Sequence, residues 1–207
     1  MVTGTQRFMY AGMALLAAVI GLTSLRYLLP DAPGGALPVL ANANAMPWLA
    51  LHAGFGAVAL LIGPVQFLPG FRRRFTSVHR AMGVTYAVSA TVSAVAGIIL
   101  ALGITSGPVA AAGFGLLGVV WLGATAMAVR AVIAGRFAEH RRWMVRSFAL
   151  TLSAVALRIQ LFMAGMTGLS FEASYPVIAF ACWIPNLIVA EIWLRRRSAA
   201  AGPALAE

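Results

Sequence analysis

The chain has 207 residues, of which 61% are hydrophobic and only 10% are charged, and its mean hydropathy is +0.91. A soluble domain of this length needs more polar surface, so the composition predicts a protein of the lipid bilayer. The formal net charge of +10 would suggest a nucleic-acid partner for a soluble protein. In a membrane protein such positive charge sets the orientation of the helices across the bilayer, so we expect no nucleic-acid partner.

Six apolar segments are long enough to cross a hydrocarbon core of ~30 Å. In chain order they lie near residues 8–29, 48–68, 81–103, 109–133, 145–168 and 175–194. Because unpaired backbone groups are costly in lipid and no segment alternates like a strand, each is predicted to be a helix. The sequence thus predicts an all-α integral membrane protein with six transmembrane helices. We expect one domain over residues 1–197 and a disordered cytoplasmic tail over residues 198–207.

The basic residues predict the orientation. All fifteen are arginines, and most fall before the first segment, after the second, between the fourth and fifth, or after the sixth. The opposite loops hold no arginine and include Asp31 and Glu172. By the positive-inside rule both termini are cytoplasmic, and we expect the inner membrane of a bacterium.

Residues about 48–103 are repeated at about 109–168. The sequence AGFG at 53–56 recurs at 112–115, the pair HR at 79–80 recurs at 140–141, and TVSAVA at 91–96 recurs as TLSAVA at 151–156. Matches in one order at nearly one offset indicate an internal duplication of a helical hairpin. Because both copies run in the same direction, we expect a pseudo-two-fold axis along the membrane normal. The predicted core is a four-helix bundle from this parallel hairpin repeat, with the first and sixth helices flanking it.

Three of the helices carry polar or small residues on one face. These residues are His52, Gly56, Gly63 and Gln66 on the second, His79, Tyr86, Ser89 and Ser93 on the third, and His140, Ser147, Thr151 and Arg158 on the fifth. Lipid offers such groups no partner, so these faces should point into the bundle. Hydroxyls that bond the preceding helical turn are an alternative explanation.

His52 and Arg158 lie at similar depth near the outer surface, and with Gln160 they form a candidate ligand-binding or structural polar site. An arginine within the membrane needs a partner or a water-filled cavity. The alternative is an arginine that reaches outward and pairs with Glu172. For Glu191, an ion pair with Arg195 at the i+4 position is expected.

His79 and His140 occupy equivalent positions of the repeat near the arginine-rich end. Paired histidines at one depth on separate helices are what a b-type haem needs, with arginines for its propionates. Histidines of the membrane interface are the alternative. Cys182 is the only cysteine, so no disulfide within the chain is possible, and core packing is its expected role.

Several stretches align in order with a known family. They are GPVQF at 63–67, SVHRAMGVTY at 77–86, HRRWMVRSFALT at 140–151, and the shorter segments LR at 157–158 and WIPN at 183–186. The chain resembles the bacterial predicted membrane proteins grouped as domain of unknown function 2306, over most of its length from the second helix onward. The resemblance implies a multi-pass inner-membrane architecture and no established activity.

Three functions remain open. The first is a non-catalytic membrane protein, either an accessory subunit of a membrane protein partner or a binder of a small lipophilic ligand. The second is a redox protein with haem between His79 and His140 that exchanges electrons with quinone near Arg158. The third is a small-solute transporter with Arg158 in the pathway. No phosphate-binding loop, cysteine pair or intramembrane carboxylate pair is present, so no catalytic residue is assigned and an enzyme is not favoured.

Overall fold

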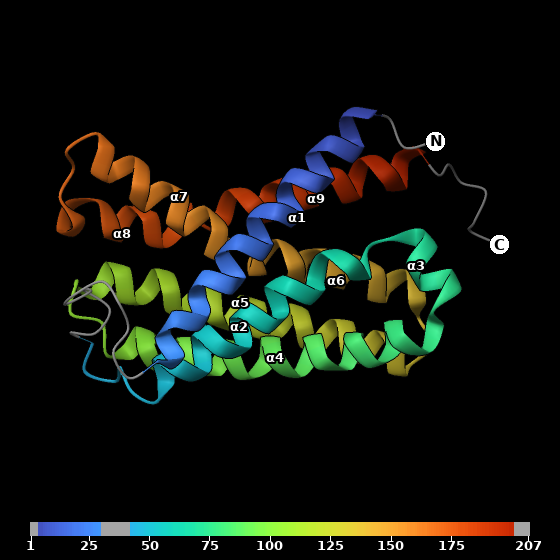
Figure 1. Cartoon of the computed structure of the whole chain (residues 1–207), viewed down its shortest axis with the longest axis horizontal. Helices are drawn as coiled ribbons and strands as arrows, with labels where there is room; N and C mark the ends of the chain where they lie inside the picture. The colour runs from blue at the N-terminus through green and yellow to red at the C-terminus, as the bar shows by residue number, and fades with distance from the viewer. Residues whose placement is uncertain (1–3, 30–41, 201–207) are drawn as a thin grey trace.

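The computed structural model of the chain describes residues 4–29 and 42–200, which are helical apart from short connections (Figure 1). The helices are α1 (Gly4–Ser24), η1 (Leu25–Leu28), α2 (Trp48–Gln66), α3 (Pro69–Arg74), α4 (Thr76–Leu102), α5 (Pro108–Ile133), α6 (Phe137–Thr151), α7 (Ser153–Met166), α8 (Phe171–Ala181) and α9 (Ile184–Ala200). No strand occurs in the described ranges, and six spans are long and apolar enough to cross a membrane. The all-α class and the six transmembrane helices are therefore confirmed.

The helices α2, α4, α5 and α6 form the bundle. The α4 helix packs against α2 and α5, and α6 packs against α5 and α2. Because α4 and α6 share both neighbours, they lie diagonally across the bundle. The first span flanks it through contacts of α1 with α2, and the sixth through contacts of α9 with α6.

Glycines let these helices approach closely. A Cβ added at Gly113 in α5 would lie 2.7 Å from the Cβ of Ala179 in α8, and one at Gly118 would lie 2.5 Å from Ile98 Cγ1 in α4. A Cβ at Gly63 in α2 would overlap the ring of Phe148 in α6. Small residues replace the hydrophobic driving force that lipid does not supply, because they extend the van der Waals contact between helix backbones.

The fifth and sixth spans each break partway. The fifth breaks at Leu152 between α6 and α7, and the sixth breaks at Cys182 and Trp183 between α8 and α9. Past its break, α7 packs mainly on α8, and α8 takes the place beside α5 (Figure 1). A proline within a helix favours a kink, and Pro185 follows the break of the sixth span, whereas neither glycine nor proline marks the break at Leu152.

Amide side chains cap the carbonyls that these breaks release. Pro185 has no N–H, so the carbonyl of Ala181 lacks its usual helical donor, and Gln160 Nε2 in α7 donates to it at 3.0 Å. Asn186 Nδ2 in α9 donates to the carbonyl of Ala149 in α6 at 3.3 Å and to that of Cys182 at 3.2 Å. Each span thus satisfies a backbone group of the other, as a lipid environment requires.

The segment before α2 caps α4. Helices leave their last carbonyls without intrahelical donors, and Asn42 Nδ2 and Asn44 Nδ2 donate to Leu100 O and Ile99 O at 2.7 and 2.9 Å. At the other end of the chain, α9 includes Ala200 and so takes in the first residues of the predicted tail. The rest of that tail, residues 201–207, lies outside the described residues.

We predict that Gly113→Ala destabilises the protein by about 1–3 kcal/mol, because the added methyl group meets the backbone of Ala179 at 3.0 Å. Gly123→Ala is the matched control in the same helix, since no atom lies within 4 Å of its added Cβ. Reversible unfolding by SDS in mixed micelles measures the free energy of unfolding. Equal stability of the two variants would contradict the close α5–α8 contact.

Candidate functional site

Polar side chains lie at three levels along the axis of the protein. Histidines lie at the arginine-rich end, hydroxyl groups lie at mid-height, and His52 and Arg158 lie toward the opposite end. The first two levels join α4 to α6 or to their neighbours, so the polar residues of these levels point inward, whereas Arg158 contacts α1.

Four hydroxyl groups meet at mid-height. Tyr86 Oη lies 3.0 Å from Ser147 Oγ and 2.8 Å from Thr151 Oγ1, and Thr125 Oγ1 lies 2.8 Å from Ser147 Oγ. All four side chains are at most 3% exposed. Thr151 and Thr125 also donate to carbonyls one turn back, so inward hydrogen bonds and bonds to the preceding turn coexist here. The cluster links the diagonal helices α4 and α6 through the centre of the bundle.

His52 ties α2 to α4. Its Nδ1 lies 2.9 Å from the carbonyl oxygen of Ser93, and Ser93 Oγ donates to the carbonyl of His52 at 2.8 Å. A carbonyl only accepts, so Nδ1 carries the proton and Nε2 of the neutral ring keeps a free lone pair. A Cβ at Gly97 would lie 3.0 Å from His52 Nδ1, so the glycine makes room for the ring.

Arg158 joins α7 to the end of α1. Its guanidinium donates to the carbonyl of Ala154 at 2.9 Å and to Ser24 Oγ at 2.8 Å. Arg26 and His52 both lie within electrostatic range of Arg158. The described residues contain two ion pairs, Arg136 with Glu139 and Arg146 with Glu191, and neither includes Arg158. The structure thus brings His52 and Arg158 to one region without a carboxylate from the described chain.

Three expectations about polar partners are wrong. Glu172 is exposed at the start of α8 and does not pair with Arg158. Glu191 pairs with Arg146 of α6 at 2.5 and 3.0 Å, because a bidentate guanidinium across the α6–α9 contact outcompetes Arg195 on its own helix. Gln160 is two positions from Arg158, about 200° around the helix, so it faces α8 instead of His52.

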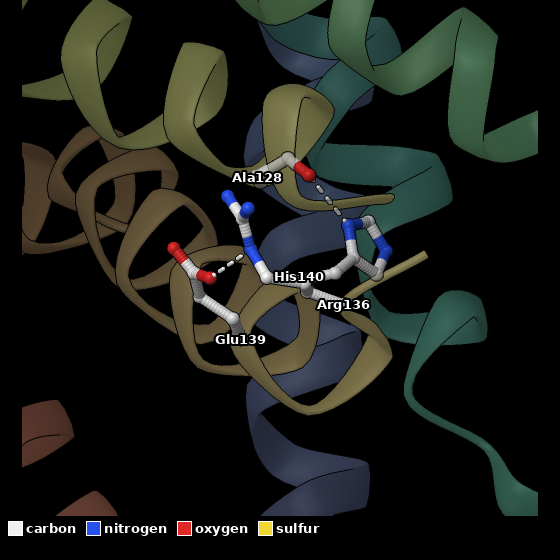
Figure 2. A network of polar contacts seen from close by, with 4 residues as sticks. All are labelled: Ala128, Arg136, Glu139 and His140. Carbon is white, nitrogen blue, oxygen red and sulfur yellow. Dashed lines mark hydrogen bonds and ion pairs between the residues drawn. The ribbon is translucent and has the colours of Figure 1, made fainter. Parts of the chain in front are cut away.

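His79 and His140 lie in the first turns of α4 and α6, at equivalent helix positions. His140 Nδ1 lies 2.9 Å from the carbonyl of Ala128 in α5, as Figure 2 shows, while Arg136 pairs with Glu139 beside it at 2.6 Å. The carbonyl of His79 accepts from Gln66 Nε2 at 3.0 Å, whereas His79 Nδ1 and Gln66 Oε1 are buried without a partner among the described residues. His79 and His140 thus lie near each other at the arginine-rich end.

One of two surface grooves borders the central hydroxyl cluster, because Thr125 lines it. This groove, of about 540 Å³, lies between α4 and α5, and Arg130 is among the residues that line it. A second follows α9. Both are lined mostly by apolar side chains, which suits contact with lipid chains. Within the described ranges, no group of three or more histidine, cysteine or acidic side chains could hold a bare metal ion.

The comparisons with known proteins agree with this architecture. A family model described as "Predicted membrane protein (DUF2306)" matches residues 49–194, a range that contains all three histidines and Arg158. No curated protein and no solved structure matches the chain. The resemblance expected from the sequence is therefore confirmed.

We predict that Tyr86→Phe lowers the free energy of unfolding by about 0.6–1 kcal/mol, since it removes a hydroxyl that bonds two buried partners. Thr85→Val is the control, because the Thr85 hydroxyl is exposed and bonds only Ala81 O in its own helix. A double-mutant cycle with Ser147→Ala, followed by SDS unfolding, measures the coupling. Strictly additive effects of Tyr86→Phe and Ser147→Ala would contradict the network.

Proposed function

Because the chain belongs to the predicted membrane protein family DUF2306, we propose a function within the bilayer, the non-catalytic binding of a small lipophilic ligand whose anionic head group meets Arg158. The proposed setting is the inner membrane of a bacterium with both termini in the cytoplasm. In that orientation Arg158 faces the outer leaflet, and the ligand reaches it from there.

The observation that supports this proposal is the environment of the Arg158 guanidinium. It is partly buried within a transmembrane span, yet its partners in the described chain are a hydroxyl and a carbonyl, both neutral. Leaving a cation in the membrane without a counter-charge is costly. A guanidinium has five N–H donors, and these two bonds use only part of that capacity.

The neighbouring groups favour an anion over a neutral ligand. Arg26 is exposed and its guanidinium carbon lies 5.0 Å from the ring centre of Tyr27, so a second cation stands near Arg158. Planar guanidinium groups bind carboxylate and phosphate oxygens in pairs. Two exposed apolar side chains nearby, Leu22 of α1 and Leu28 of η1, offer contact for an apolar tail.

Asp31 is the competing counter-charge. It belongs to the segment 30–41, which is outside the described residues. It is also the acidic residue closest in sequence to Ser24 and Arg26. A structural Arg158–Asp31 pair would explain the partly buried cation without any ligand. The experiment must therefore separate these two explanations.

The broken spans favour a second function, the transport of a small solute. Transporters bind substrates where discontinuous helices meet inside the membrane, and the α6–α7 and α8–α9 breaks are joined by Asn186. Arg158 follows the first break by less than two turns. Uptake of a labelled long-chain carboxylate into proteoliposomes, lost in Arg158→Met, would support transport, whereas binding without flux would leave only the binding function.

For the binding function, we predict that the purified protein binds a fluorescent long-chain carboxylate or a lysophospholipid but not the matching alcohol. Arg158→Met should raise the Kd at least ~10-fold, since it removes a charge-assisted contact worth more than ~1.4 kcal/mol. Arg130→Met, at the groove between α4 and α5, is the matched control and should leave the Kd unchanged. The two probes distinguish a carboxylate from a phosphate head group.

Asp31→Asn decides between the ligand and the structural pair. If the ligand is the counter-charge, this variant keeps the wild-type Kd and the wild-type melting temperature. If wild-type protein binds no anionic amphiphile, and Asp31→Asn and Arg158→Met lower the melting temperature equally, Arg158 is a structural residue and the proposal fails. Arg158→Lys keeps the charge and serves if Arg158→Met does not fold.

A further inference from the structure

The arginine-rich end holds two histidines on diagonal helices. His79 is in the fourth position of α4 and His140 is in the fourth position of α6. Each lies seven residues before a member of the central cluster, Tyr86 or Ser147, which are in direct contact. Equal spacing from one crossing point places both imidazoles at one depth, about 10 Å along the helices from the hydroxyl groups.

The hydrogen bonds of these residues suit axial ligands. His140 Nδ1 donates to the carbonyl of Ala128, which fixes the ring and leaves Nε2 as the free lone pair. His79 Nδ1 is buried without a described partner, and so is Oε1 of Gln66, whose amide already contacts the backbone of His79. If His79 Nδ1 donated to Gln66 Oε1, both histidines would have a second partner of the kind that metal-bound imidazoles use.

The surrounding charge selects the kind of metal centre. Arg72 lies within electrostatic range of His79 and of Arg141. The two guanidiniums repel a bare divalent cation, and the two imidazoles are too few ligands for one. A porphyrin with two propionates brings negative charge to the guanidiniums and needs only two axial ligands.

From this arrangement we propose that the bundle binds one b-type haem per chain, with His79 and His140 as axial ligands and with Arg72 and Arg141 at the propionates. Diagonal helices of a four-helix bundle can present two inward side chains to one cofactor in its core. His52 is hydrogen-bonded to Ser93 at another level of the bundle, and no second histidine lies at that level. This site is independent of the proposed function at Arg158, and each can fail without the other.

The test is the haem content of the full-length protein, expressed in cells supplied with a haem precursor and purified in detergent. We expect about one haem per polypeptide by the pyridine haemochrome assay and a low-spin spectrum typical of bis-histidine ligation. His79→Ala and His140→Ala should each lower the haem content at least ~10-fold at the same gel-filtration profile. His52→Ala is the matched control and should keep the wild-type content.

Further variants keep the result decisive. If an alanine variant does not fold, His79→Met replaces it, because methionine is an alternative axial ligand and should retain haem with a raised reduction potential. If the protein is colourless on purification, hemin is titrated into it, and stoichiometric binding that needs both histidines supports the site. Failure to bind added hemin, or full haem content in both alanine variants, overturns the proposal.

Discussion

A bilayer offers no hydrogen-bond partner to a polar group, and this constraint accounts for most of the contacts that join the helices of this protein. Gln160 and Asn186 cap the carbonyls released by the two broken spans, and Asn42 and Asn44 cap the end of α4. In each case the donor and the carbonyl come from different parts of the fold. Satisfying a polar group therefore also fixes one element against another.

The same constraint locates the candidate sites, because at these sites the described chain leaves a polar or charged group without a full set of partners. Trp121 Nε1 and Gln160 Oε1 are also buried without a partner. Both groups are neutral, so a water molecule or a small rotation of the side chain suffices to give each a hydrogen-bond partner. A guanidinium at Arg158 and an imidazole beside guanidiniums at His79 are harder to satisfy. Charge, more than the lack of a partner alone, separates the candidate sites from ordinary packing.

The sequence predicts the parts of this structure that depend on one helix at a time. Segment length predicts the six spans, and the period of 3.6 residues predicts that Tyr86, Ser93, Ser147 and Thr151 face inward. Thr125 was missed because it is a lone hydroxyl on an otherwise apolar helix and forms no stripe. The break at Leu152 was missed because neither glycine nor proline marks it, and its carbonyl cap comes from α9. Gln160 was placed at the wrong site because sequence position supplies depth and leaves rotation about the bundle unknown.

The predicted duplication explains why the two candidate sites differ in kind. Tyr86 and Ser147 are 61 positions apart, as are His79 and His140, so equivalent positions of the two repeats meet in the bundle. A group held there must accept similar contacts from two sides, which a planar porphyrin does. His52 and Arg158 correspond in the repeat to Ala111 and Ile98, which carry no polar group. Their site is therefore one-sided, and the ligand proposed for it would have one charged end near α7 and α1, with the rest of the molecule in the lipid.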